Sequence, residues 1–191
     1  MPQMNMQHTN VFLALDALLI RYVNLFKNDT PQLPSVPFDS AWRSPCEDSH
    51  NDTLNFWRPK ERSEPELFSE LESALEIKFH PDIKDFYGSF WSNGICVERD
   101  DINFSLIQVW NEEDQANLKE NLLGHAFAKI KARLPLSFFI GCTYGDDVVC
   151  LEQESGQIVL EKPGRKAHKV LSDSLENFLI SLEPTKDAYD S

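Results

Sequence analysis

Basic residues, long apolar runs and paired cysteines are all scarce in this chain. Its 191 residues include 18 Lys and Arg against 31 Asp and Glu, which gives a formal net charge of -13. A surface of that sign repels nucleic-acid phosphates and anionic lipid headgroups, and it attracts cationic protein segments. The composition therefore predicts a basic protein partner, and no direct binding to nucleic acid or lipid.

The most apolar stretch, residues 11–26, contains Asp16 and Arg21 and is too short to cross a hydrocarbon core about 30 Å thick. No Lys or Arg precedes Arg21 and no small-residue cleavage pattern follows, which argues against a secretory signal. The four cysteines form no C-x-x-C pair and no zinc-type spacing. These absences predict a cytoplasmic protein with reduced thiols.

Catalytic motifs are also missing: G-x-x-x-x-G-K-[ST], G-x-G-x-x-G, G-x-S-x-G and H-E-x-x-H do not occur. The five histidines are scattered. His125 is the best candidate for chemistry, although a hydrogen-bonded structural histidine is the simpler interpretation. We therefore predict a protein that is not an enzyme, with no catalytic residues, no metal site and no cofactor.

The pattern along the chain predicts one α+β domain over residues 1–191, with a largely antiparallel sheet and flanking helices. An N-terminal helix over residues 11–26, capped by Asn10, is followed by a proline-rich irregular segment at 27–64 and a core at 65–182. The tail, residues 183–191, is expected to fray. The core helices are expected at 65–77, from Pro81 to a stop at Asn93-Gly94, at 112–131 after the cap Asn111, and at 175–182. The strands are expected at 95–97, 102–110, 136–143, 148–152 and 157–161.

The carboxylates fall into short clusters that border these strands and helix ends. Each cluster taken alone is explained as solvated surface, and residues 112–114 also suit a first helical turn, where the macrodipole favours negative charge. Together, we expect them to line one acidic concave face that binds the partner. The predicted partner-binding residues are Glu98, Asp100, Asp101, Glu112, Glu113, Asp114, Asp146 and Asp147.

Several segments resemble a known family. Residues 81–94 (PDIKDFYGSFWSNG) resemble the helix of the SUKH superfamily that begins at proline and ends at glycine. Residues 106–114 (LIQVWNEED) and 120–125 (ENLLGH) are similar to a stretch specific to the Syd family within it. Residues 134–140 (LPLSFFI) and 175–179 (LENFL) complete the order, so the resemblance covers roughly residues 67–182.

The resemblance to the Syd family implies a SUKH-like fold and a cytoplasmic protein that lies peripherally on the inner membrane. There it would contact basic cytosolic loops of SecY, in the SecYEG translocon, through an acidic concave surface. Membrane association would then be indirect, with a role in translocon quality control or regulation. The alternative is an immunity protein of the same superfamily that neutralises a polymorphic toxin, and the stretch at 106–125 argues against it. A third reading, a hydrolase or nuclease with paired acids and a metal, lacks a metal-binding motif.

Overall fold

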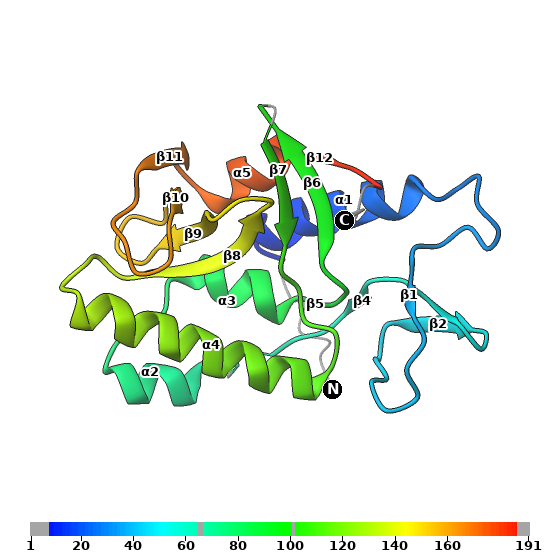
Figure 1. Ribbon diagram of the computed structural model, residues 1–191, viewed down its shortest axis with the longest axis horizontal. Helices are drawn as coiled ribbons and strands as arrows, with labels where there is room; N and C mark the ends of the chain where they lie inside the picture. Colours follow the sequence, from blue (N-terminus) through cyan, green and yellow to red (C-terminus); the bar gives the residue numbers. More distant parts are fainter. Residues whose placement is uncertain (1–7, 65–66, 101, 187–191) are drawn as a thin grey trace, which may run out of the picture.

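The computed structural model describes residues 8–64, 67–100 and 102–186. Within these ranges, helices surround an antiparallel sheet, which confirms the predicted α+β class (Figure 1). The helices are α1 (Asn10–Asn24), α2 (Ser69–Leu75), α3 (Pro81–Gly88), α4 (Glu112–Lys131) and α5 (Leu175–Ser181).

The main sheet has seven strands in the order β11-β10-β9-β8-β7-β6-β12, and every neighbouring pair is antiparallel. Sequential hairpins build most of it, and α4 is inserted between β7 and β8. The strands are β6 (Ile95–Arg99), β7 (Ile102–Leu106), β8 (Ser137–Thr143), β9 (Val148–Glu152), β10 (Ile158–Glu161), β11 (Lys169–Ser172) and β12 (Glu183–Pro184).

The helices pack on the sheet in two groups. Helix α1 contacts α3 and α5, whereas α4 runs along β8 with α2 beside it (Figure 1). Their buried rows follow the predicted helical spacing: Leu15 on α1 and Ile83 and Phe86 on α3 are fully buried. The helices therefore bury the apolar stripes that their sequences carry.

The proline-rich segment differs from the prediction. Within residues 27–64, three short strands form a sheet in the order β1-β3-β2, with β1 (Ser35–Pro37), β2 (Glu47–His50) and β3 (Leu54–Trp57). Proline is tolerated because Pro37 lies on an edge strand, while the central strand β3 contains none. The aromatic residues fix the segment to the body as expected, since Trp57 is fully buried and contacts Trp110.

Several helix boundaries also differ. Helix α1 ends at Asn24 rather than at residue 26, and α2 spans Ser69–Leu75 within the predicted 65–77. Thr9 rather than Asn10 caps α1, because its hydroxyl accepts a hydrogen bond from the amide of Phe12 at 3.2 Å. Helix α3 ends at Gly88 instead of continuing to residue 93. The next residues form β5 (Phe90–Trp91), which pairs with β4 (Lys60–Glu61). Pairing with a distant strand overrides the local helical pattern there.

The strand predicted at 102–110 ends at Leu106, so the phase change at Ile107 marks the end of β7. Strand β11 was not predicted. The first residues of the tail are also ordered, because Glu183 and Pro184 pair with Glu98 and Val97 of β6. Residues 187–191 lie outside the described residues. Long-range pairing to the sheet edge therefore replaces the expected fraying at the start of the tail.

Candidate functional site

Two predicted acidic residues lie at the tip of the β6–β7 hairpin. Glu98 is exposed near the end of β6. Asp100 follows in the turn with a left-handed φ of 50°, and its carboxylate pairs with Arg99 at 3.2 Å. Asp101 lies outside the described residues. Among the residues described at this hairpin, Glu98 has no ion-pair partner, whereas Asp100 has one.

The β8–β9 turn brings Asp146 and Asp147 to the same end of the sheet. The register shows this: Gly141 pairs with Leu106 at the end of β7 and Thr143 pairs with Phe104, so the chain after Thr143 continues toward the start of β7. Asp147 lies 3.0 Å from the Nε2 of His168, and Asp146 lies 3.6 Å from the Nζ of Lys162. We call Glu98, Asp100, Asp146 and Asp147 the hairpin-end acids; three of the four have a cationic or titratable neighbour.

The remaining predicted acids form the first turn of α4, and we call Glu112, Glu113 and Asp114 the α4-start acids. The side chain of Asn111 accepts a hydrogen bond from the Asp114 amide at 2.8 Å. Asp114 in return accepts one from the amide of Trp110 at 2.8 Å. This reciprocal cap explains why the helix begins at Glu112. Glu112 and Glu113 are exposed, and neither has an ion-pair partner in the part of the chain that the structure describes.

These two groups lie at opposite ends of the main sheet. The chain enters β7 at the hairpin tip and leaves it at Leu106 toward α4 (Figure 1). Five strand residues at about 3.3 Å each separate the groups by roughly 15 Å. The predicted residues that the structure describes thus fall into two separate acidic surfaces, instead of the single concave face expected. Fewer ion pairs neutralise the α4-start acids than the hairpin-end acids.

Two hollows flank the first turn of α4. On one side, a groove of about 430 Å³ lies between α2 and α4, and Glu112 lines it. We call this the α2–α4 groove. On the other side, a hollow of about 290 Å³ is lined by Asp114 together with Trp42 and Trp110. Glu112 and Asp114 therefore each border a hollow, and the walls of the α2–α4 groove are mainly apolar.

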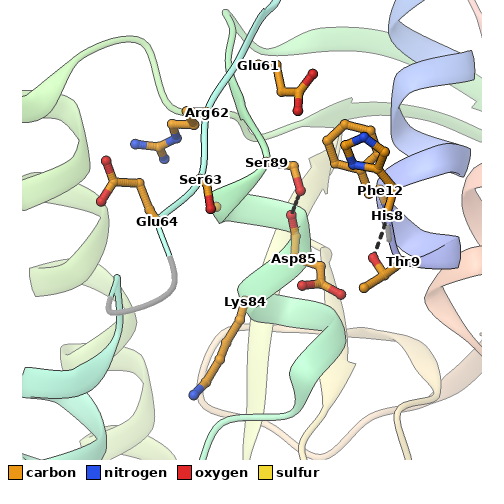
Figure 2. Close-up of a pocket in the computed structure, with 11 residues that line it drawn as sticks. His8, Thr9, Phe12, Glu61, Arg62, Ser63, Glu64, Lys84, Asp85 and Ser89 are labelled. Carbon is orange, nitrogen blue, oxygen red and sulfur yellow. Dashed lines mark hydrogen bonds between the residues drawn. The ribbon is translucent and has the colours of Figure 1, made fainter. Parts of the chain in front are cut away.

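A third hollow lies between α1, α3 and the segment 61–64 (Figure 2). Its cationic groups point away from the rings of His8 and Phe12 in the close-up. The guanidinium of Arg62 instead stacks on Trp91 at 3.8 Å and donates to the carbonyl of Tyr87 at 2.6 Å. Burial lowers the pKa of Arg62 to about 10. These contacts of Arg62 hold the segment 61–64 against α3 and β5.

A buried polar cluster joins α4 to the sheet. Lys129 donates to Glu161 at 2.7 Å, Ser137 donates to the same carboxylate at 3.0 Å, and His125 lies 3.3 Å from it. Burial alone would raise the pKa of Glu161, but the hydrogen bonds from His125, Lys129 and Ser137 lower it overall. His125 therefore has the structural setting that its sequence context predicts.

This cluster also contains a possible metal-ligand set. Ligand atoms of His125, Cys150 and Glu161 lie within 4.8 Å of one another. Lys129 already neutralises Glu161, however, and a divalent cation would stand beside that buried ammonium group. Burial also raises the pKa of the Cys150 thiol well above its usual value, which opposes the thiolate that a metal requires. We interpret the cluster as a structural ion pair.

Sequence reasoning missed both the α2–α4 groove and this cluster. One signal was present: Lys129 continues the buried row of Leu122 and Ala126 at helical spacing. A lysine on that row indicates a buried charge that needs a partner. The groove had no comparable signal, because it depends on where α2 packs.

The fold and these surfaces define a small α+β protein with two acidic surfaces, one of which borders the α2–α4 groove. Among the described residues, no helix combines the length and apolarity needed to cross a bilayer. The model of the family described as Syd protein (SUKH-2) matches residues 12–184. The chain therefore belongs to the Syd family.

Curated relatives agree with this assignment. The chain is 39% identical over 189 residues to "Protein Syd" of Hahella chejuensis, covering 96% of this chain and 98% of that protein. It is 32% identical over 177 residues to "Protein Syd" of Pseudoalteromonas atlantica, covering 90% and 95%. A third relative, "Protein Syd" of Colwellia psychrerythraea, is 35% identical over 161 residues, covering 78% and 80%.

Proposed function

We propose that this protein is a non-enzymatic binding protein for the SecY subunit of the Sec translocon, acting at the cytoplasmic face of the inner membrane. The observation that carries the proposal is the pair Glu112 and Glu113 at the start of α4. Both are exposed and have no ion-pair partner among the residues described, and Glu112 lines the α2–α4 groove. On a chain of net charge -13, these carboxylates suit Lys and Arg of basic SecY loops. Membership of the Syd family supports the same partner.

The energetics require several contacts. Each exposed ion pair contributes about 0.2–1 kcal/mol, whereas micromolar affinity corresponds to about -8 kcal/mol. The α4-start acids are the proposed main contacts because they are the least neutralised. Asp100, Asp146 and Asp147 already face Arg99, Lys162 and His168, so the hairpin-end acids are proposed as a weaker second contact.

Co-sedimentation with inner-membrane vesicles tests this function. Vesicles that contain SecY are compared with vesicles depleted of it, at 0.1 M and 1 M salt. The Debye length falls from about 10 Å to about 3 Å over that range, so SecY-dependent binding should weaken steeply. Absence of SecY-dependent binding at low salt would contradict the proposal and favour the alternative of a toxin-immunity protein.

Charge reversal locates the contact. The double variant Glu112→Lys/Glu113→Lys should bind SecY vesicles roughly tenfold more weakly, because two lost pairs and new repulsion together exceed about 1.4 kcal/mol. Asp52→Lys/Glu154→Lys is the matched control, since both residues are exposed, without ion pairs in the described ranges, and give the same change in net charge. Equal weakening by the two variants would mean that only bulk charge matters.

A further inference from the structure

Helix α4 carries an apolar stripe that its own fold covers only in part. Leu118, Leu122 and Ala126 form its buried row, but Phe127 is 51% exposed and Ile130 is 46% exposed. Leu123 lies one turn earlier on the same face; it is half-buried against the core and also lines the α2–α4 groove. We call Leu123, Phe127 and Ile130 the α4 stripe.

The α4 stripe and the α2–α4 groove lie on one face of the helix. At 100° per residue, positions 112, 116, 123, 127 and 130 fall within about 60° of one another. The groove occurs where Ala74 on α2 and Ala116 on α4 present only methyl groups. From position 112 to position 130 the surface runs about 27 Å along the helix axis, so it is a long, narrow docking surface.

The charges around the groove select a cationic occupant. Its lining includes Glu70, Glu112 and Glu120 against a single lysine, Lys119. Lys119 lies 3.7 Å from Glu70, which leaves Glu112 and Glu120 without ion-pair partners among the described residues. A second copy of this chain would oppose its own glutamates, and an anionic membrane surface would be repelled.

The backbone of α4 offers no strand edge to an incoming peptide, because its hydrogen bonds are made within the helix. An extended peptide would leave its own amides unpaired against an apolar surface, whereas a helix satisfies them internally. Amphipathic helices dock in grooves through apolar residues at three- and four-residue spacing. The α4 stripe has that spacing.

We propose that the α2–α4 groove and the α4 stripe bind a basic amphipathic helix of the partner protein, with its apolar face on Leu123, Phe127 and Ile130 and its cations beside Glu112 and Glu120. The inference deepens the proposed function, since it assigns the apolar part of the same interaction. It also gives that interaction a component that salt does not screen.

A synthetic peptide tests the docking surface directly. The probe is an 18-residue helical peptide of leucine and lysine, with leucines at three- and four-residue spacing, and fluorescence anisotropy gives its affinity. A scrambled peptide of the same composition is the peptide control. The two peptides have equal charge, so any difference in affinity reports recognition of the apolar face. We expect the ordered peptide to bind at least tenfold more tightly than the scrambled one.

Three variants then assign the surface. Ala116→Trp fills the groove without changing charge, and Phe127→Ser removes the centre of the stripe; each should weaken the ordered peptide at least tenfold. Ile180→Ser is the matched control, because Ile180 is an apolar residue on α5 that is 59% exposed. The affinity of this variant for the ordered peptide should stay within twofold of the wild type. Circular dichroism confirms that each variant is folded. Equal binding of the ordered and scrambled peptides would overturn the inference. Wild-type affinity in either Ala116→Trp or Phe127→Ser would also overturn it.

The same variants in the SecY vesicle assay separate this inference from the proposed function. Peptide binding that depends on the groove, without SecY-dependent vesicle binding, would retain the docking surface and reject SecY as partner. SecY binding that ignores Ala116→Trp and Phe127→Ser would retain the function and reject this surface. Sedimentation showing a dimer that Phe127→Ser dissociates would also overturn the inference, because a second copy would then cover the stripe.

Discussion

The substitution Lys129→Met removes one partner of the ion pair that joins α4 to the sheet. The two charged atoms are 2.7 Å apart, and the side chains of Lys129 and Glu161 are 2% and 1% exposed. Removing one partner of such a buried pair costs about 3–5 kcal/mol, because the other charge remains in the interior. Ser137 and His125 still contact Glu161, so we expect the free energy of unfolding to fall by about 3 kcal/mol.

Urea denaturation at pH 7, followed by the fluorescence of the four tryptophans, measures this loss. Lys119→Met is the matched control on the same helix. Its pair with Glu70 spans 3.7 Å, and the glutamate is 82% exposed, so the control should lose at most about 1 kcal/mol. A loss below about 1 kcal/mol for Lys129→Met would refute the reasoning that the buried pair carries this junction.

The pH dependence supplies a second test of the same substitution. In the wild type the pKa of Glu161 is lowered, so its contribution is present above an unfolded value of about 4.3 and is lost as pH falls. Without Lys129, burial raises the pKa of Glu161 relative to the wild type. The deficit of Lys129→Met should therefore shrink between pH 7 and pH 4. A deficit that is constant or growing over that range would contradict this sign.

Three further substitutions test the fold around the site. Burial would raise the pKa of Glu72, but hydrogen bonds, led by that from Lys84, lower it to about 2. Glu72→Gln should therefore destabilise the protein at pH 7. In acid titrations the destabilisation should decrease progressively below about pH 4. Gly156→Ala should cost about 1–2 kcal/mol in urea melts, because φ is 71° and the added Cβ would lie 2.7 Å from the ring of His80. Asn111→Ala removes the α4 cap and should cost about 1 kcal/mol by the same assay; an unchanged midpoint would show that the cap is dispensable.

Features that depend on neighbouring residues in the sequence were predictable. Asn111 with three acidic residues after it marks the start of α4, and Pro81 marks the start of α3. The meander from β8 to β10 follows from short apolar runs separated by turn residues. Each of these signals lies within the element that it specifies.

Features that depend on distant partners were not predictable in this way. Phe90 and Trp91 continue a helical pattern, but they pair with Lys60 and Glu61 instead. The α4 stripe has the same apolar character as the buried row beside it, and only the packing of the sheet decides which row is covered. The acidic residues were identified from sequence, while their division between two ends of the sheet follows from the strand register.

The most direct test of the central claim is the affinity of this protein for SecY-containing vesicles, measured for the wild type, Glu112→Lys/Glu113→Lys and Asp52→Lys/Glu154→Lys at 0.1 M salt. The account predicts SecY-dependent binding that falls roughly tenfold in the first variant and changes little in the second. Binding that is independent of SecY, or that falls equally in both variants, would contradict a specific contact at the start of α4.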